Sequence, residues 1–222
     1  SQIELRVMAH LSGDDNMIEA FREGYDIHAA TAAKIYKETI DSVTRDQRTK
    51  AKRANFGIIY GITVFGLAER LEISRDEAKQ LIDGYFQTFP KVQLYMEAAK
   101  ETARQKGYAE TFFHRRRYLP DINSGNATVR NFAERNAINA PIQGSAADII
   151  KIAMIRIHEQ FHMKRLRSKM ILQVHDELNF SVVPEERDIV EQIVLTEMQN
   201  AYRLKVPLVA DSGWGENWLE AH

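Results

Sequence analysis

The sequence predicts an α+β fold, in which an antiparallel sheet built from both chain ends accompanies a helical insert. Three observations support this prediction. β-type patterns open and close the chain, helical periodicity dominates its first half, and two β-rich runs flank the polar tripeptide His175-Asp176-Glu177. We therefore expect a short first segment (1–12), a mostly helical insert (13–125) and a second sheet-containing segment (126–222).

The composition limits the class of protein. The chain has 222 residues, 44% of them apolar, with no cysteine and a formal net charge of −1. It can bury a substantial core, and it has neither a disulfide framework nor a thiolate metal site. It contains no apolar run of about 18 residues and no signal-peptide pattern at its start. We therefore expect a cytoplasmic protein with no membrane partner.

The first elements follow from the spacing of apolar residues. Ile3, Leu5 and Val7 alternate with polar residues, which is typical of a strand with one buried face. From residue 14 to about residue 106 the apolar residues recur at helical spacings. A helical segment therefore follows the predicted strand.

The next two elements are a candidate hairpin and a long helix. Residues 108–120 combine aromatic residues with an HRRR cluster, which indicates a short hairpin or an irregular loop. The apolar stripe from Ala146 to Phe161 then predicts a long helix.

The last third of the chain predicts a hairpin, a helix and a strand. The β-rich runs 170–174 and 178–183 place His175-Asp176-Glu177 at a hairpin tip. A helix is expected to begin at Pro184, and the segment VPLVADS (206–212) predicts a final strand.

The segment RTKAKRANFGIIYG (48–61) has basic residues at one end and aromatic residues towards the other. Thr44 and Gln47 form a capping-box pattern that predicts a helix start just before it. Cations near the amino end of a helix suit a polyphosphate, and aromatic side chains further along suit a sugar or base. The residues spaced by four that would share one face of this helix are Arg48, Lys52, Phe56 and Tyr60.

A solvated basic face above an aromatic core would explain this spacing in most helices. Gly57 and Gly61 favour a binding face instead, because glycine inside a helix costs about 1 kcal/mol relative to alanine. Something other than helix stability must therefore require close approach at these two positions.

Several motifs, in order along nearly the whole chain, resemble those of bacterial family A DNA polymerases of the DNA polymerase I type. RTKAKRANFGIIYG resembles the motif of the fingers helix that binds the incoming nucleotide. SQIELRVMAHLSGD and QVHDEL resemble the first and last palm motifs, and RNAINAPIQGSAADIIK and GENWLEAH also match. The resemblance implies that residues 1–12 and 126–222 are palm and that residues 13–125 are fingers.

The resemblance implies binding of a deoxynucleoside triphosphate. Arg48 and Lys52 would hold the triphosphate, and Lys52 would also protonate the departing pyrophosphate. Phe56 would pack on the sugar, and Tyr60 would lie beside the templating position. The other implied nucleotide-binding residues are His28 at the phosphate tail, Glu4 as the group that excludes a 2′-hydroxyl, and Gln2. Without the motifs, His28 would be read as a surface helix residue and Glu4 as an exposed strand carboxylate.

The resemblance also implies two Mg²⁺ ions held by carboxylates. Asp176 would be a bridging ligand, and Glu177 a nearby, secondary catalytic carboxylate. The second aspartate ligand of the family lies two positions before the serine that matches Ser1 and falls outside this chain. We therefore expect this chain alone to be inactive. Without the motif, an HDE at a hairpin tip is more often a polar turn.

Primer–template DNA would contact a further group of residues. Arg135, Asn139 and Gln143 are spaced by four and would share a helix face. Asparagine and glutamine can donate to the minor-groove acceptors N3 and O2, which checks pair geometry without reading sequence. The resemblance adds His175 as a DNA contact, whereas the HRRR arginines suit either phosphates or a solvated loop.

The sequence thus predicts a fragment of a template-directed DNA polymerase, which extends a primer by two-metal-ion nucleotidyl transfer and acts as a monomer. The alternative is a non-catalytic nucleotide- or DNA-binding module that retains the fold. The presence together of Asp176, Lys52, Arg48 and Tyr60 argues against that alternative. A single-subunit RNA polymerase of the phage type is disfavoured by Glu4 and by QVHDEL.

Overall fold

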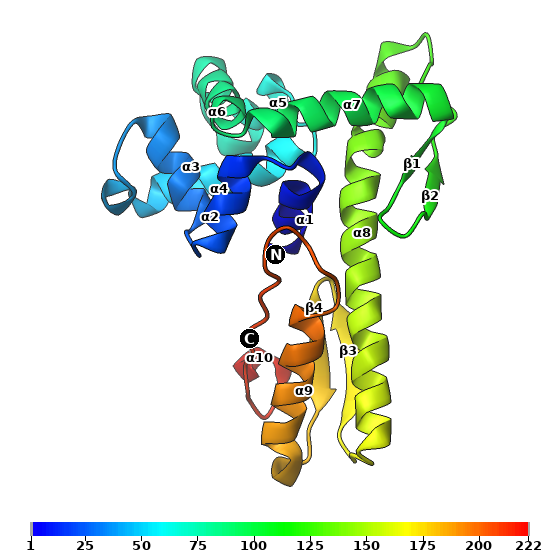
Figure 1. The fold of residues 1–222 in the computed structure, drawn as a ribbon. Helices are drawn as coiled ribbons and strands as arrows, with labels where there is room; N and C mark the ends of the chain where they lie inside the picture. Colours follow the sequence, from blue (N-terminus) through cyan, green and yellow to red (C-terminus); the bar gives the residue numbers. More distant parts are fainter. Residues whose placement is uncertain (1, 222) are drawn as a thin grey trace. The chain divides into compact units, whose positions relative to one another are not determined.

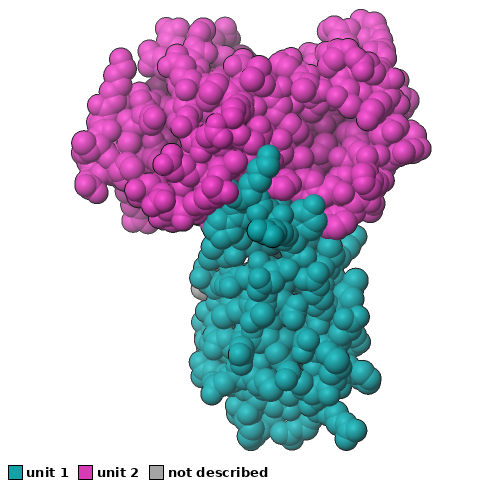
Figure 2. Space-filling view, in the orientation of Figure 1, with its two compact units in different colours: residues 1, 146–222 teal, residues 2–145 magenta. Residues whose placement is uncertain are grey.

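The computed structural model of the chain describes residues 2–221. Ser1, the first residue of the predicted segment 1–12, and His222, the last residue of the predicted segment 126–222, lie outside the described residues. The chain forms two units, unit 2 from Gln2 to Ser145 and unit 1 from Ala146 onward (Figures 1 and 2). In the described residues, helices predominate and the strands form two separate antiparallel pairs. The predicted α+β class is confirmed. None of the helices described is long and apolar enough to cross a membrane.

Unit 2 is mainly helical. Its elements are α1 (Ile3–Ser12), α2 (Asp15–Arg22), α3 (Ile27–Tyr36), η1 (Ile40–Ser42), α4 (Arg45–Ile59), α5 (Val64–Leu71), α6 (Arg75–Thr88), α7 (Pro90–Lys106), β1 (Tyr108–Glu110) and β2 (Arg116–Tyr118). The helix α8 (Ala127–Met163) begins in unit 2 and continues into unit 1. Side-chain oxygens cap the amino ends of most of the earlier helices, so the sequence itself sets where they begin. The capping residues are Asp14, Asp26, Thr44, Thr63 and Ser74.

The predicted first strand is wrong, because residues 3–12 form the helix α1. Leu5, Val7 and Met8 are all fully buried, since α1 packs against α2, α4 and α7. A helix that is enclosed on most sides has apolar residues around its whole circumference, so its sequence shows no helical period. The end of α1 is marked instead by Gly13, whose φ of 61° suits the left-handed position after a helix.

The core of unit 2 holds α3, α4 and α6 in close contact. A Cβ atom added to Gly84 of α6 would lie 2.9 Å from Ile35 Cγ1 of α3, so glycine permits this close approach. Large side chains that are almost fully buried fill the rest of the core of this unit. They include Leu5, Met8, Met17, Ile27, Ile59, Leu67, Tyr85 and Leu81.

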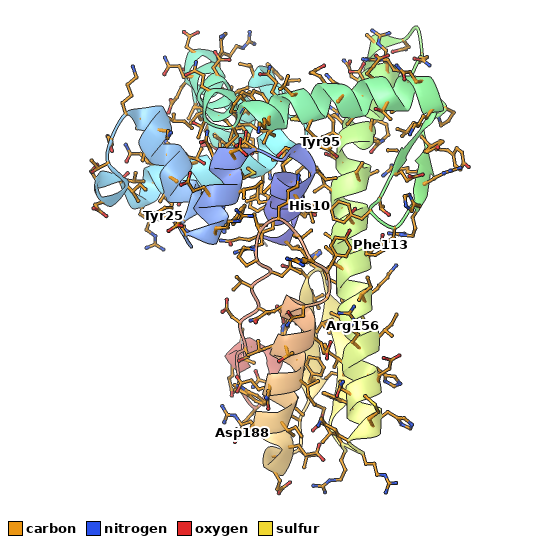
Figure 3. The ribbon with its side chains drawn as sticks, in the orientation of Figure 1. His10, Tyr25, Tyr95, Phe113, Arg156 and Asp188 are labelled. Carbon is orange, nitrogen blue, oxygen red and sulfur yellow. The ribbon has the colours of Figure 1, made fainter. Side chains whose placement is uncertain are left out.

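Of the two alternatives for residues 108–120, a short hairpin or an irregular loop, the structure has the hairpin. β1 pairs antiparallel with β2, and Tyr108 lies opposite Tyr118. The backbone N–H of Phe112, in the connecting loop, donates to Ser145 Oγ on α8 (3.0 Å), which fixes the loop against that helix. Beside the loop, the Phe112 ring meets the ring of His10 edge-on at 4.9 Å; Figure 3 labels His10 and the adjacent Phe113.

Unit 1 contains the second predicted hairpin. After α8 come β3 (Lys169–Val174), β4 (Glu177–Ser181), η2 (Pro184–Glu186), α9 (Arg187–Gln199) and α10 (Trp218–Ala221). β3 and β4 pair antiparallel, and Val174 lies opposite Glu177. The predicted helix start at Pro184 is present as a short 3₁₀ turn that leads into α9. Arg156 of α8, labelled in Figure 3, donates to the Asn200 carbonyl just after α9 (2.8 Å).

The predicted final strand is wrong, because residues 206–212 have no regular secondary structure. Pro207 removes one backbone donor from this segment, which weakens any ladder. Side chains of α9 hold it instead: Gln199 Nε2 donates to the Ala210 carbonyl (3.3 Å), and Glu191 accepts from Ser212 Oγ. Since α1 is also helical, the predicted sheet uniting both chain ends does not form within residues 2–221.

The boundary between the units falls inside α8, at residues 145 and 146. This boundary separates two compactly packed bodies, and packing alone does not separate palm from fingers. The division into palm and fingers at residues 12 and 125 therefore stays a prediction.

Candidate functional site

The helix α4 begins where the sequence predicts. Thr44 Oγ1 accepts from the Gln47 backbone N–H (3.3 Å), and Gln47 Oε1 accepts from the Thr44 N–H (2.7 Å), which completes a capping box. Ala51, Ala54 and Ile58 point into the core of unit 2.

The other face of α4 carries the basic and aromatic residues. Arg48 and Phe56 are partly accessible, Lys52 is exposed, and Tyr60 is the partly accessible residue that ends the helix. The binding role of these residues stays a prediction, but the helix from Arg45 to Ile59 does place Arg48, Lys52 and Phe56 along one face, with Tyr60 at its C-cap. This face presents cations near the amino end and aromatic rings towards the carboxyl end.

Gly57 and Gly61 are explained by packing within unit 2. A Cβ atom on Gly57 would lie 3.1 Å from Ile62 Cγ2, where the chain turns back after α4. Gly61 has a φ of 73°, which disfavours other residues, and a Cβ there would lie 3.3 Å from Arg135 Cγ. Close approach is therefore needed at both positions, as predicted, but the approaching atoms belong to this chain.

Asp26 connects α3 to the basic end of α4. It is the N-cap of α3, where its Oδ1 accepts from the backbone N–H groups of His28 (2.9 Å) and Ala29 (3.2 Å). Its other oxygen, Oδ2, forms an ion pair with Arg48 Nε. The hydrogen bond from Arg48, with those from the two backbone N–H groups, outweighs partial burial and lowers the pKa of Asp26.

His28 is buried beside the middle of α4. Its Nδ1 lies 3.1 Å from Asn55 Nδ2, and its ring lies 5.9 Å from that of Phe56. The Thr31 hydroxyl donates to the Ile27 carbonyl, so it can only accept from the same Asn55 nitrogen (3.1 Å).

The tautomer of His28 follows from this arrangement. Asn55 must present its NH₂ group to Thr31, and that group also faces His28 Nδ1. We therefore assign Nδ1 as an acceptor and place the ring proton on Nε2. Burial, opposed by Asp26 and assisted by the charges of Arg48 and Lys52, lowers the pKa of His28 to about 4. His28 is thus a neutral donor at pH 7.

We expect His28 to make unit 2 sensitive to mild acid. The unfolded chain protonates this histidine near pH 6.5, whereas the folded chain resists until about pH 4, so stability falls as the pH drops through this window. Between pH 7 and pH 5 the loss should be about 2 kcal/mol. Denaturant unfolding at both pH values, in the wild type and in His28→Gln, measures it. Equal pH dependence in the two proteins would contradict the assignment.

Gln2 and Glu4 lie at the amino end of α1. Gln2 Oε1 accepts from Arg6 Nη2 (3.2 Å), and the Arg6 guanidinium lies 4.6 Å from the centre of the Phe21 ring. Glu4 is half-buried in the first turn, where a carboxylate is favoured by the helix dipole. Glu4 therefore lies in the helix α1 and Gln2 is its N-cap, where the sequence predicts a strand.

Arg135, Asn139 and Gln143 share a face of α8, as predicted. Arg135 packs beside Gly61, and the Oδ1 atom of Asn139 is buried without a hydrogen-bond partner in the described residues. Gln143 is exposed and borders a cavity of about 200 Å³. The cavity is lined by Ala109, Thr111, Arg115, Arg116, Arg117, Ala140, Gln143 and Gly144. The structure thus brings the HRRR arginines together with Gln143.

The remaining candidates lie in unit 1, at the turn between β3 and β4. His175 has a φ of 53°, and Gln173 Nε2 donates to its carbonyl oxygen (3.0 Å), which stabilises the turn. Asp176 is half-buried in this turn. Glu177 begins β4 and accepts from Trp218 Nε1 (2.6 Å).

The carboxylates at this turn suit a hard divalent cation, which prefers oxygen ligands. One oxygen of Glu177 accepts from Trp218 Nε1, and the preference for Asp176 as the ligand comes from the family resemblance. Nowhere in residues 2–221 do three or more histidine, aspartate or glutamate side chains gather closely enough to hold a metal. The role of Asp176 as a metal ligand therefore stays a prediction.

Sequence reasoning missed Asp26 and Asn55. Asp26 directly precedes a helical run, which is the usual position of an N-cap and was a usable signal. Nothing local indicates that it also pairs with Arg48, which is 22 residues further along the chain. Asn55 lies inside the quoted segment, but its partner His28 is 27 residues away.

Comparison with known proteins agrees with these motifs. The model of the family "DNA polymerase family A" matches residues 1–220. The chain is 52% identical over 221 residues to DNA polymerase I of Bacillus caldotenax, covering 100% of this chain and 25% of that protein. It is also 52% identical over 222 residues to DNA polymerase I of Streptococcus pneumoniae, again covering 100% of this chain and 25% of the relative.

A solved structure is also similar. It is described as the POL domain of Pol1 from M. smegmatis in complex with DNA primer-template and dNTP, with a TM-score of 0.96 and 48% identity. The match covers 100% of this chain and 39% of that one, and the chain spans about a quarter of the length of the curated relatives above. On the family match and these identities, the chain belongs to DNA polymerase family A.

Proposed function

We propose that this chain forms the nucleotide-binding face and one catalytic carboxylate of a template-directed DNA polymerase, which adds deoxynucleotides to a primer 3′ end. The observation that carries the proposal is the face of α4 from Arg48 to Tyr60, which has cations near its amino end and aromatic rings towards its carboxyl end. The similar M. smegmatis domain is described in complex with primer-template DNA and dNTP, which supports the same two partners here.

On this proposal, the triphosphate binds at the amino end of α4. The exposed Lys52 provides a mobile ammonium that neutralises phosphate charge and donates a proton to the leaving pyrophosphate. Arg48 supplies a fixed guanidinium held by Asp26, and neutral His28 supplies an N–H donor. The protein's contribution to this step is positioning and charge stabilisation.

The sugar and base would follow along the same face. Phe56 would pack on the sugar, and Tyr60 would lie next to the templating position at the end of α4. Glu4, on α1, would exclude a 2′-hydroxyl, with Gln2 beside it in sequence. Because α1 packs against α4 within unit 2, these residues belong to one folded body.

DNA contacts are proposed for residues of each unit. In unit 2, Arg135, Asn139 and Gln143 on α8 would contact the primer–template, and in unit 1 His175 would be a separate contact. The cavity that Gln143 shares with Arg115–Arg117 concentrates positive charge, which suits phosphates. As the family resemblance implies, we propose that the protein works as a monomer.

Asp176 would hold a divalent cation, which we propose is Mg²⁺, with Glu177 as a secondary carboxylate. When bound, such ions neutralise the charge that develops on the attacking and leaving oxygens. A two-ion site needs more ligands than Asp176 and Glu177 provide. We therefore expect the isolated 222-residue chain to be inactive.

Template-directed extension is the direct test. With Mg²⁺, the intact protein should extend a primer by the complementary deoxynucleotide only, and a chelator should stop the reaction. The 222-residue chain, assayed in parallel at catalytic concentration, should form no product. Robust extension by this chain would contradict the proposed incomplete metal site.

A different outcome would favour a non-catalytic nucleotide- or DNA-binding module. The intact protein would then bind primer–template and deoxynucleotide but form no product with any divalent cation. Such a module has no need of a metal carboxylate, so Asp176→Asn would leave its binding unchanged.

A further inference from the structure

Asp26 connects two proposed phosphate ligands, His28 and Arg48. Within residues 2–221, no other acidic side chain is described in contact with both. The Oδ1 atom of Asp26 holds the backbone N–H of His28, and its Oδ2 holds Arg48 Nε. The following inference rests on the proposed function, because it assumes that the triphosphate binds Arg48.

The geometry leaves part of Arg48 available. The ion pair with Asp26 uses Nε, whereas the two terminal nitrogens of the guanidinium form the opposite edge of the group. The Arg48 side chain is 44% exposed. A phosphate can therefore approach this edge while Asp26 still holds Nε.

The charges work against that approach. Asp26 cannot turn away easily, because its Oδ1 is fixed by two backbone N–H groups at the start of α3. A phosphate on Arg48 would thus come close to a carboxylate that remains negative at neutral pH, since the pKa of Asp26 is lowered. Like charges this close raise the free energy of the bound state.

We propose that Asp26 is a positioning residue that holds Arg48 Nε while a phosphate binds the terminal nitrogens, and that its negative charge weakens the binding of nucleotide and pyrophosphate to this site. In the empty site, Asp26 orients the Arg48 guanidinium and neutralises its positive charge. In the filled site it repels the anion. The expected consequence is moderate nucleotide affinity and rapid release of pyrophosphate.

Asp26→Asn in the intact protein removes the negative charge, and with it the ion pair to Arg48 Nε, while it keeps the N-cap of α3. Asparagine is as good an N-cap as aspartate, so α3 and the N–H of His28 should keep their positions. With primer–template bound, the dissociation constants of the complementary deoxynucleotide and of pyrophosphate should fall about three- to ten-fold. The change should shrink at high salt, because it is electrostatic and partly exposed.

Asp46→Asn is the matched control. Asp46 lies in the first turn of α4 and pairs with Lys50 at 3.1 Å, so its replacement removes the same charge near the same helix end without touching Arg48. It should leave both dissociation constants within about two-fold of the wild type. An equal effect of Asp26→Asn and Asp46→Asn would show a general field effect and overturn the proposal.

Arg48→Ala distinguishes failure of this inference from failure of the proposed function. If Arg48→Ala leaves nucleotide binding unchanged, the proposed site itself is wrong. If Arg48→Ala weakens binding but Asp26→Asn weakens it too, or has no effect, only the role of Asp26 is overturned. In the Arg48→Ala background, Asp26→Asn should no longer tighten the binding of nucleotide and pyrophosphate appreciably, because the guanidinium beside Asp26 is absent.

Discussion

Replacing Asp176 by asparagine in the intact protein is expected to slow nucleotide incorporation about a thousand-fold, which corresponds to about 4 kcal/mol of lost transition-state stabilisation. The two side chains have nearly the same shape, so the β3–β4 turn should persist. Asparagine lacks the negative charge that suits a hard cation. The rate of a single turnover at saturating nucleotide and Mg²⁺ is the measurement.

Glu177→Gln provides the matched control at the adjacent position. Glu177 accepts from Trp218 Nε1, and a glutamine can keep that hydrogen bond through its carbonyl oxygen. Its loss of rate should be ten-fold or less, or about 1.4 kcal/mol, because the hydrogen bond to Trp218 is kept and only the charge of a secondary carboxylate is lost. A larger loss of rate for Glu177→Gln than for Asp176→Asn would show that Glu177 is the main metal ligand and Asp176 the secondary carboxylate. Nucleotide binding without metal should be unchanged in both variants, which separates a metal role from misfolding.

Features set by neighbouring residues were predictable from the sequence. The capping box at Thr44 and Gln47, the β3–β4 hairpin and the long helix α8 all depend on patterns within a few residues, and all are present. The same holds for the shared face of α4, because a spacing of four fixes it once the helix exists.

Features set by tertiary surroundings were not predictable in the same way. The alternation of Ile3, Leu5 and Val7 suggested a strand, but burial of α1 among three helices removes any period from its sequence. The pairs Asp26–Arg48 and His28–Asn55 join residues that no local rule connects. These pairs set the charge state of Asp26 and the tautomer of His28, so the chemistry of the candidate site depends on the fold.

Replacing Phe56 by tyrosine is expected to improve the use of dideoxynucleotides about ten- to a hundred-fold relative to deoxynucleotides. The family resemblance implies that phenylalanine at this position accompanies discrimination against the dideoxy form. Phe56 is partly accessible on the proposed sugar-binding part of α4, and its ring offers no polar atom. A dideoxynucleotide lacks its 3′-hydroxyl, so a polar group in the closed site would lose its partner.

A lost partner of this kind costs about 1–3 kcal/mol, which is the origin of the expected ten- to hundred-fold range. The tyrosine hydroxyl can restore the missing polar contact, whereas normal substrates already provide it and should change little. The measurement is the ratio of kcat/KM for deoxy and dideoxy substrates. Phe65→Tyr, which adds the same hydroxyl to an exposed ring on α5, should leave this ratio unchanged. Equal ratios in the wild type and Phe56→Tyr would show that residue 56 does not lie beside the sugar. Because Phe56 is the proposed sugar contact, that result would contradict the assignment of α4 as the nucleotide-binding face.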